Sequence, residues 1–219
     1  MQPTAFDDVA GRPDPPLDVF ALALAAEFGQ VAWREAGDRL DQLGREVAAC
    51  LSDAPRAPHR DIAACRLVLS ERHGFTGDAT DYGDPRNSML DAVLSRGKGL
   101  PITLSILWVE VARRAGVELA GVGLPGHYVV GHFRPDPPLL ADPFNDGAIV
   151  TSEPPAHLVR PWGAHETVLR MLNNLVRSYT ERGDLTRALH AAGLRLPLSR
   201  GEEREGYAGE LTRLEARLN

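Results

Sequence analysis

The hydrophobic pattern of this chain is helical over its first half and at its end, and strand-like in between. Over residues 33–51, apolar side chains recur with spacings of three, four and four residues, at Leu40, Leu43, Val47 and Leu51. This spacing places them on one face of a helix. Similar patterns predict helices over 17–28, 61–72 and 85–96. Residues 1–16 contain four prolines and little apolar periodicity, so a loose tail is expected there.

The most apolar of the predicted helices begins at Pro101. From Ile102 to Val109 only Thr103 and Ser105 are polar, so apolar side chains surround most of the helix and it is expected to be buried. Proline suits the first helical position because the N–H that it lacks would have no partner there. A buried helix N-terminus offers free N–H groups and a partial positive charge, which favour a nucleophile of lowered pKa or a bound anion.

Short β-branched and aromatic segments follow this helix and are separated by glycine and proline: 117–124, 126–133, 139–142 and 148–150. The prolines in the turn 134–138 cannot donate to a strand ladder. The segments therefore predict an antiparallel meander, and the fold class is α+β, with the central buried helix packed on a short sheet. From Glu166 onward, two helices joined at Gly183-Asp184 resemble one tetratricopeptide-type unit, which must pack on the core or on a partner. A charged surface helix is expected over 202–219.

One histidine and one aspartate fall on neighbouring predicted strands. If 126–133 and 139–142 form a hairpin, His127 and Asp142 lie roughly opposite each other, with Cβ atoms about 5 Å apart. The aspartate would then accept the imidazole Nδ1–H and fix its tautomer, as the third member of a catalytic triad does. The alternative is a histidine that is hydrogen-bonded for structure alone. The other six histidines show no such pairing in the sequence.

Candidate nucleophiles are few. Cys50 and Cys65 lie in helical segments without a glycine-rich entry turn, and we interpret both as small buried apolar residues rather than nucleophiles. Thr103 and Ser105 are hydroxyl alternatives, but bonds from their hydroxyls to helix carbonyls are the favoured interpretation. For Asn87 and Ser88, in the first turn of their predicted helix, satisfying the backbone is at least as well supported as a substrate role.

Composition excludes several classes of function. The chain has 219 residues, 43% of them apolar, and a net charge of −6, with Lys98 as its only lysine and no basic stripe. Nucleic acid is therefore not an expected partner. Metal-ligand spacings and phosphate-binding glycine loops are absent from the sequence, so no metal and no other cofactor is expected. No apolar run approaches the roughly 20 residues of a membrane span, and two cysteines suit a reducing compartment. We expect a soluble cytoplasmic protein.

Several motifs together resemble the SirB1 family of the transglutaminase-like superfamily. They are Asp81-Tyr82, Asp84-Pro85-Arg86-Asn87-Ser88, Gly99-Leu100-Pro101-Ile102-Thr103-Leu104-Ser105, Gly121-Val122-Gly123-Leu124-Pro125-Gly126-His127 and Asp142-Pro143-Phe144-Asn145. The resemblance spans about residues 17–192. It implies a papain-like core over 17–160 that includes the N-terminal helices, and a tetratricopeptide-like extension over 161–219.

The same resemblance implies a triad whose cysteine begins the central helix. Laid on this sequence, Pro101 occupies the cysteine position, while His127 and Asp142 match the other two roles. Proline has no nucleophilic atom. The leading hypothesis is a non-catalytic protein whose groove and helical extension bind a peptide or protein partner. The expected groove residues are Asn87, Gly99, Thr103, Ser105 and Asn145. The alternative is a hydrolase or acyl transferase that uses His127 and Asp142 with water or Ser105 as the nucleophile.

Overall fold

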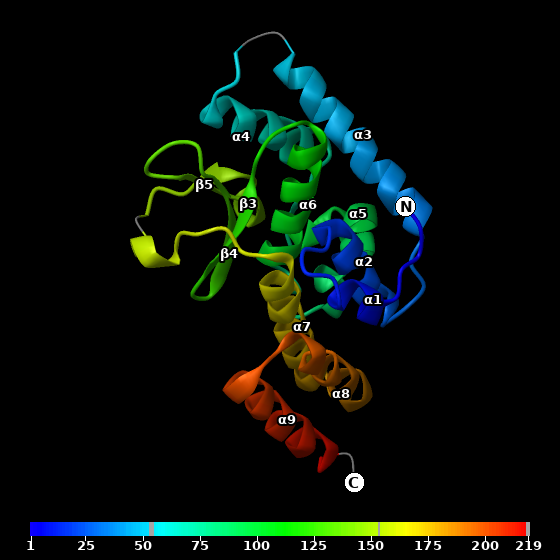
Figure 1. Cartoon of the computed structure of the whole chain (residues 1–219). Helices are drawn as coiled ribbons and strands as arrows, with labels where there is room; N and C mark the ends of the chain where they lie inside the picture. The colour runs from blue at the N-terminus through cyan, green and yellow to red at the C-terminus, as the bar shows by residue number, and fades with distance from the viewer. Residues whose placement is uncertain (53–54, 153, 218–219) are drawn as a thin grey trace.

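The computed structural model describes residues 1–52, 55–152 and 154–217. Helix α6 (Pro101–Arg114) lies between a sheet on one side and helices of the N-terminal half on the other (Figure 1). Every residue from Pro101 to Trp108 is buried. Charged side chains gather at the other end of α6, where Glu110 and Arg114 form an ion pair. The expected α+β architecture with a central buried helix is confirmed.

The N-terminal half supplies the helices that cover α6. They are α2 (Leu17–Ala26), α3 (Trp33–Leu51), α4 (Pro58–Arg66), its π-helical continuation Leu67–Arg72, and α5 (Leu90–Arg96). The bounds of α3 coincide with the predicted segment, and Leu40, Leu43, Val47 and Leu51 are all buried. Strong helical periodicity on one face was enough to define this element.

Two predictions for the N-terminal half are wrong. Residues 1–16 are not a loose tail throughout, because α1 (Phe6–Ala10) lies there and buries Phe6 and Val9. These side chains are three positions apart and share a helix face. The ring of Phe6 packs on that of Phe20 with centroids 5.3 Å apart, a contact that no local pattern indicates.

The predicted helix over 85–96 is interrupted. A 3-10 turn, Pro85–Ser88, precedes α5, and Met89 between them is extended. The carbonyl of Asn87 accepts its hydrogen bond from the Leu100 amide instead of from within a helix. The expected stop at Gly97 is confirmed by its left-handed conformation, with φ of +73°.

The sheet is the predicted antiparallel meander. Its order is β3 (Ala120–Leu124), β4 (His127–His132), β5 (Leu139–Asp142) and β6 (Ala148–Ile149). A separate parallel pair joins β1 (Thr76–Gly77) to β2 (Lys98–Gly99). The first strand begins later than predicted because the Val117 amide still donates to the carbonyl of Ala112, which closes the end of α6.

The C-terminal extension consists of α7 (Ala164–Glu181), α8 (Leu185–Gly193) and α9 (Gly201–Glu215). Buried side chains of α7, such as Met171 and Leu175, belong to the same hydrophobic cluster as those of α6. The extension therefore packs on the core through α7, while α9 lies at the far end of the molecule from the sheet (Figure 1). The last two residues of the expected extension, 218–219, lie outside the described residues. In the described ranges, no helix is both long and apolar enough to cross a bilayer.

Candidate functional site

His127 and Asp142 meet at the start of β4 and the end of β5. The Nε2 atom of His127 lies 2.6 Å from Oδ2 of Asp142. The strand register pairs Val130 with Ala141 and His132 with Leu139. Asp142 is therefore level with Val129, two residues from His127, and the two side chains meet on the diagonal rather than directly across the ladder. The expected contact is present, and the two residues are offset by two positions along the ladder because the connecting loop is centred one residue further along than expected.

The ring nitrogen that faces Asp142 also differs from the expectation. Nε2, not Nδ1, makes the contact. A neutral imidazole has one protonated nitrogen and one with a lone pair. When Nε2–H donates to the carboxylate, Nδ1 holds the lone pair and can act as a base.

Asp142 is held in place by its own turn. It caps the 3-10 turn Pro143–Asn145 and accepts a bond from the Phe144 amide at Oδ1 (3.0 Å). The Asn145 side-chain amide donates to Oδ2 over 2.7 Å. Burial raises the pKa of the Asp142 carboxyl, but the hydrogen bonds from His127, Asn145 and Phe144 outweigh it and hold the pKa below its usual value. The carboxylate is thus ionised and oriented toward His127.

His127 lines a cavity of about 290 Å³ that also reaches the first turn of α6. Pro101, the first residue of α6, lies in this lining together with Ile102, Tyr82 and Asn174. The position that the family resemblance assigns to the nucleophile therefore faces the same cavity as the histidine. It presents a pyrrolidine ring there, which neither attacks a substrate nor donates an N–H.

The five predicted groove residues all lie outside the lining of this cavity. Thr103 and Ser105 are fully buried on α6, and their hydroxyls have no hydrogen-bond partner among the described residues. The expected bonds to helix carbonyls are therefore absent, and neither hydroxyl reaches the cavity. The remaining three predicted residues, Asn87, Gly99 and Asn145, make their contacts outside the cavity lining.

Each of these three residues has a defined contact. Asn87 donates to the carbonyl of Asp81 (2.8 Å) and accepts from Arg96 (3.1 Å), which fixes the loop that carries Tyr82. Gly99 packs so closely that an added Cβ would lie 2.8 Å from Val93. Asn145 orients Asp142, as described above.

Arg170 is the site residue that the sequence pattern missed. From α7, its Nη2 donates to the carbonyls of Leu124 (2.9 Å) and His127 (2.8 Å), the two ends of the β3–β4 turn. Its guanidinium also lies 5.7 Å from the ring centroids of Tyr128 and Trp162, within cation–π range. Burial lowers the pKa of Arg170 from its usual value. The extension therefore holds the hairpin on which His127 sits.

The loop that carries Tyr82, another residue of the cavity lining, is also held by a residue at the end of α7. Arg182, the residue after α7, forms an ion pair with Asp81 and donates to the carbonyl of Gly83 over 3.0 Å. The ring of Tyr82, between them, meets Phe144 edge-on at 5.8 Å, and Phe144 in turn meets His127 at 6.4 Å. Contacts therefore run from the end of α7 through the loop that carries Tyr82 to Phe144 and His127.

Neither cysteine belongs to this site. Cys65 is fully buried, and burial raises the pKa of its thiol to about 12, so it is not a thiolate at neutral pH. Cys50 is half-buried on α3, and the cavity lining contains neither thiol. Their interpretation as packing residues agrees with this placement.

A second histidine–aspartate contact lies in the interior. His132, for which the sequence showed no partner, places Nε2 3.3 Å from Asp61 Oδ2, and both side chains are buried. Asp61 is also paired with Arg56 at 2.8 Å. Among the described residues, no cluster of three or more His, Cys, Asp or Glu side chains could hold a metal ion.

Comparison with known proteins points to one family. A family profile described as Transglutaminase-like superfamily (Transglut_core2) matches residues 34–190. The chain is similar to a UPF0162 protein of Xylella fastidiosa (strain 9a5c), with 36% identity over 149 residues, which is 60% of this chain and 53% of that protein. A UPF0162 protein of Vibrio cholerae is 33% identical over 134 residues, 61% of this chain and 47% of its own length. The chain thus spans about half the length of these relatives.

A shorter similarity extends to animals. F-box only protein 21 of Mus musculus is 37% identical over 69 residues, 32% of this chain but 11% of that protein. No solved structure matches the chain significantly.

Proposed function

Since this chain belongs to the transglutaminase-like superfamily, we propose that it is a non-catalytic member whose His127 cavity and helical extension bind a peptide or protein partner. The observation that carries the proposal is the place of Pro101. It lines the cavity beside His127 at the start of the central helix, where the superfamily resemblance puts the cysteine. The SirB1-like motifs of the sequence are part of the same proposal.

The retained parts of the site suit binding. Tyr82, Asn174 and Arg170 give the cavity an aromatic wall, an amide and a cation, which can hold a backbone or side chain of a peptide by stacking and hydrogen bonds. The cavity lining contains no cysteine, so it has no nucleophile that could form the thioester of covalent acyl transfer. We also propose a cytoplasmic location, on the ground of the two unpaired cysteines.

One observation favours an alternative. The oriented Asp142 carboxylate keeps His127 in a tautomer whose Nδ1 can accept a proton. A hydrolase that activates water through His127 is therefore the second candidate. Ser105 is not part of it, because its hydroxyl is buried outside the cavity.

The binding proposal is tested by selecting peptides from a random display library on the wild-type protein and measuring their affinity for variants. Asn174→Phe places an aromatic ring in the cavity and is expected to weaken binding at least about tenfold, because it fills the space that the peptide occupies. Thr186→Phe, which adds the same ring at an exposed position on α8, is the matched control and should bind as the wild type does. Selected peptides whose affinity Asn174→Phe leaves unchanged would refute a role for this cavity.

The catalytic alternative is tested with a panel of ester, amide and thioester substrates. The proposal predicts no turnover above buffer in the wild-type protein. Turnover of any substrate that disappears in His127→Ala would establish the hydrolase instead. Folding of that variant is checked by its thermal unfolding midpoint.

A further inference from the structure

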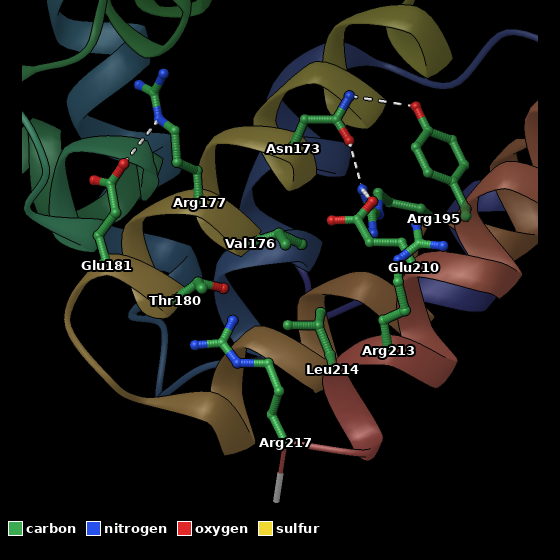
Figure 2. A pocket seen from close by; sticks show the side chains of 11 residues that line it. Asn173, Val176, Arg177, Thr180, Glu181, Arg195, Glu210, Arg213, Leu214 and Arg217 are labelled. Atoms are coloured by element: carbon green, nitrogen blue, oxygen red, sulfur yellow. Dashed lines mark hydrogen bonds and ion pairs between the residues drawn. The ribbon is translucent and has the colours of Figure 1, made fainter.

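A second hollow lies between α7 and α9, outside the His127 cavity. Its volume is about 800 Å³. In Figure 2, Val176 and Leu214 occupy its centre, and Arg177, Arg213 and Arg217 stand around them. Arg177 lines both this hollow and the His127 cavity, so the two are neighbours along α7.

The charge of the α7–α9 hollow is opposite to that of the whole protein. Four arginines and two glutamates line it, whereas the chain has a net charge of −6. Arg213 and Arg217 are exposed, and among the described residues neither has a carboxylate partner in an ion pair. Arg177 approaches Glu181 only to 3.9 Å. Arg177 and Arg195 are thus paired with the two glutamates, and Arg213 and Arg217 leave the rim with a net positive charge. Leu214 and Val176 supply an apolar floor.

Arg195 is an independent sign of a ligand. It lines the hollow, yet only 2% of it is exposed. Its Nη1 atom bonds Asn173 and Glu210, each at 3.0 Å, and its guanidinium lies 4.3 Å from the centroid of the Tyr207 ring. The other terminal nitrogen, Nη2, is buried and has no hydrogen-bond partner among the described residues. A buried donor without an acceptor is unfavourable, and a small movement of the guanidinium toward the hollow would let an incoming acceptor satisfy it.

We propose that the α7–α9 hollow binds an acidic peptide segment of a partner protein. This inference rests on the proposed function and names the chemistry of the partner. Carboxylates of the segment would pair with the guanidinium groups of Arg213 and Arg217, whose planar donors match a carboxylate in a two-point contact. An apolar side chain of the segment would cover Val176 and Leu214.

The two glutamates of the hollow favour a peptide over other anions. Glu181 and Glu210 are acceptors in the lining, and a peptide backbone brings N–H donors for them. A nucleic-acid strand carries a phosphate at every nucleotide, whereas a peptide can place its carboxylates beside the arginines and a backbone N–H beside each glutamate. A single inorganic anion also has no apolar group that could pack on Val176 and Leu214.

The test uses fluorescence anisotropy with a short labelled peptide of alternating glutamate and leucine, and a matched peptide with glutamine in place of glutamate. The full chain is compared with the double variant Arg213→Gln/Arg217→Gln. The control, Arg45→Gln/Arg72→Gln, changes the net charge equally at exposed positions on other helices. The acidic peptide should bind the wild-type protein and the control equally. It should bind the double variant more weakly by about fivefold for each arginine, with the difference shrinking as salt is added.

Three results would overturn the inference: equal affinity for the glutamine peptide, equal affinity of the two double variants, or no binding of the acidic peptide at low salt. Vesicles of anionic phospholipid and a single-stranded oligonucleotide are measured in parallel. Binding of either that depends on Arg213 and Arg217, without peptide binding, would assign the hollow to a membrane surface or a nucleic acid instead. The Asn174→Phe variant separates the two proposals, because it blocks only the His127 cavity. The effect of Asn174→Phe on library-selected peptides tests the proposed function whether or not the acidic peptide binds the α7–α9 hollow.

Discussion

Arg170, on α7, donates a hydrogen bond to the backbone carbonyl of His127 over 2.8 Å. Helix α7 therefore helps to determine the position of His127, which lies on β4. The same nitrogen bonds the carbonyl of Leu124 at the other end of the β3–β4 turn, so α7 acts as the support for the whole turn. Removing this support is expected to affect the site and the fold together.

Replacing Arg170 by leucine should lower the free energy of unfolding by about 2 kcal/mol, because two carbonyls lose a charged donor. Urea unfolding measures the loss of stability, and the NMR chemical shifts of the His127 ring report the displacement of the turn. Arg177→Leu, two turns further along α7 and exposed, is the control and should change stability by less than about 0.5 kcal/mol. An unperturbed His127 resonance in the Arg170 variant would show that the turn keeps its place without this bond.

The lowered pKa of the Asp142 carboxyl predicts a specific dependence of stability on pH. Its pKa is lower in the folded protein than the usual value of about 4. The ionised carboxylate therefore contributes its full stabilisation when the pH is above the unfolded-state pKa of about 4. This stabilisation is lost as the pH falls from the unfolded-state pKa through the lower folded-state pKa. We expect Asp142→Asn to be less stable than the wild type at pH 7 and pH 5, and the difference to narrow below about pH 4.

Urea unfolding at these pH values checks the prediction for Asp142. A difference that stays constant down to pH 3 would mean that the aspartate carries an ordinary pKa in the fold. Asp38→Asn on the exposed surface of α3 serves as the control, because an exposed ion pair contributes little at any pH.

Gly123 makes room for Trp162. A Cβ at position 123 would lie 2.1 Å from the indole ring, so Gly123→Ala must displace Trp162 from the hairpin, at about 1–3 kcal/mol. Because the displaced indole, which is partly buried against the core, becomes more exposed to water, the tryptophan emission should shift to longer wavelength. Gly29→Ala, where an added Cβ meets nothing within 4 Å, should leave both stability and emission unchanged. A stable Gly123 variant with normal emission would contradict the packing described for this strand.

Pro101→Cys tests whether the rest of the triad keeps its geometry. The new thiol would stand at the first position of α6, in the cavity with His127, where the helix N-terminus and the imidazole both favour the thiolate. It should react with iodoacetamide at pH 7 at least about tenfold faster than Cys50 of the same protein. Adding His127→Ala should remove most of this advantage. Peptide mapping by mass spectrometry assigns the label, and equal rates at both thiols would indicate that His127 is not aligned with α6.

Particular residues show how far local patterns reach. The bounds of α3 follow from apolar spacing alone, since one helix face must be buried. The β4–β5 hairpin was also predictable, but its register was not, because the loop of 133–138 could be centred on either of two neighbouring positions. Phe6 and Val9 were missed because their helix is short and is stabilised by Phe20 and the core rather than by its own sequence.

The sequence by itself determined the bounds of α3, the antiparallel meander, the buried character of α6, and the facts that Pro101 begins that helix and that His127 and Asp142 fall on adjacent strands. The tertiary structure decided which atoms meet. It brought Nε2 of His127 to Asp142 and enclosed Ser105 away from the cavity. Arg170 bonds backbone carbonyls, which every residue carries, so no side-chain pattern in the sequence could indicate its partners.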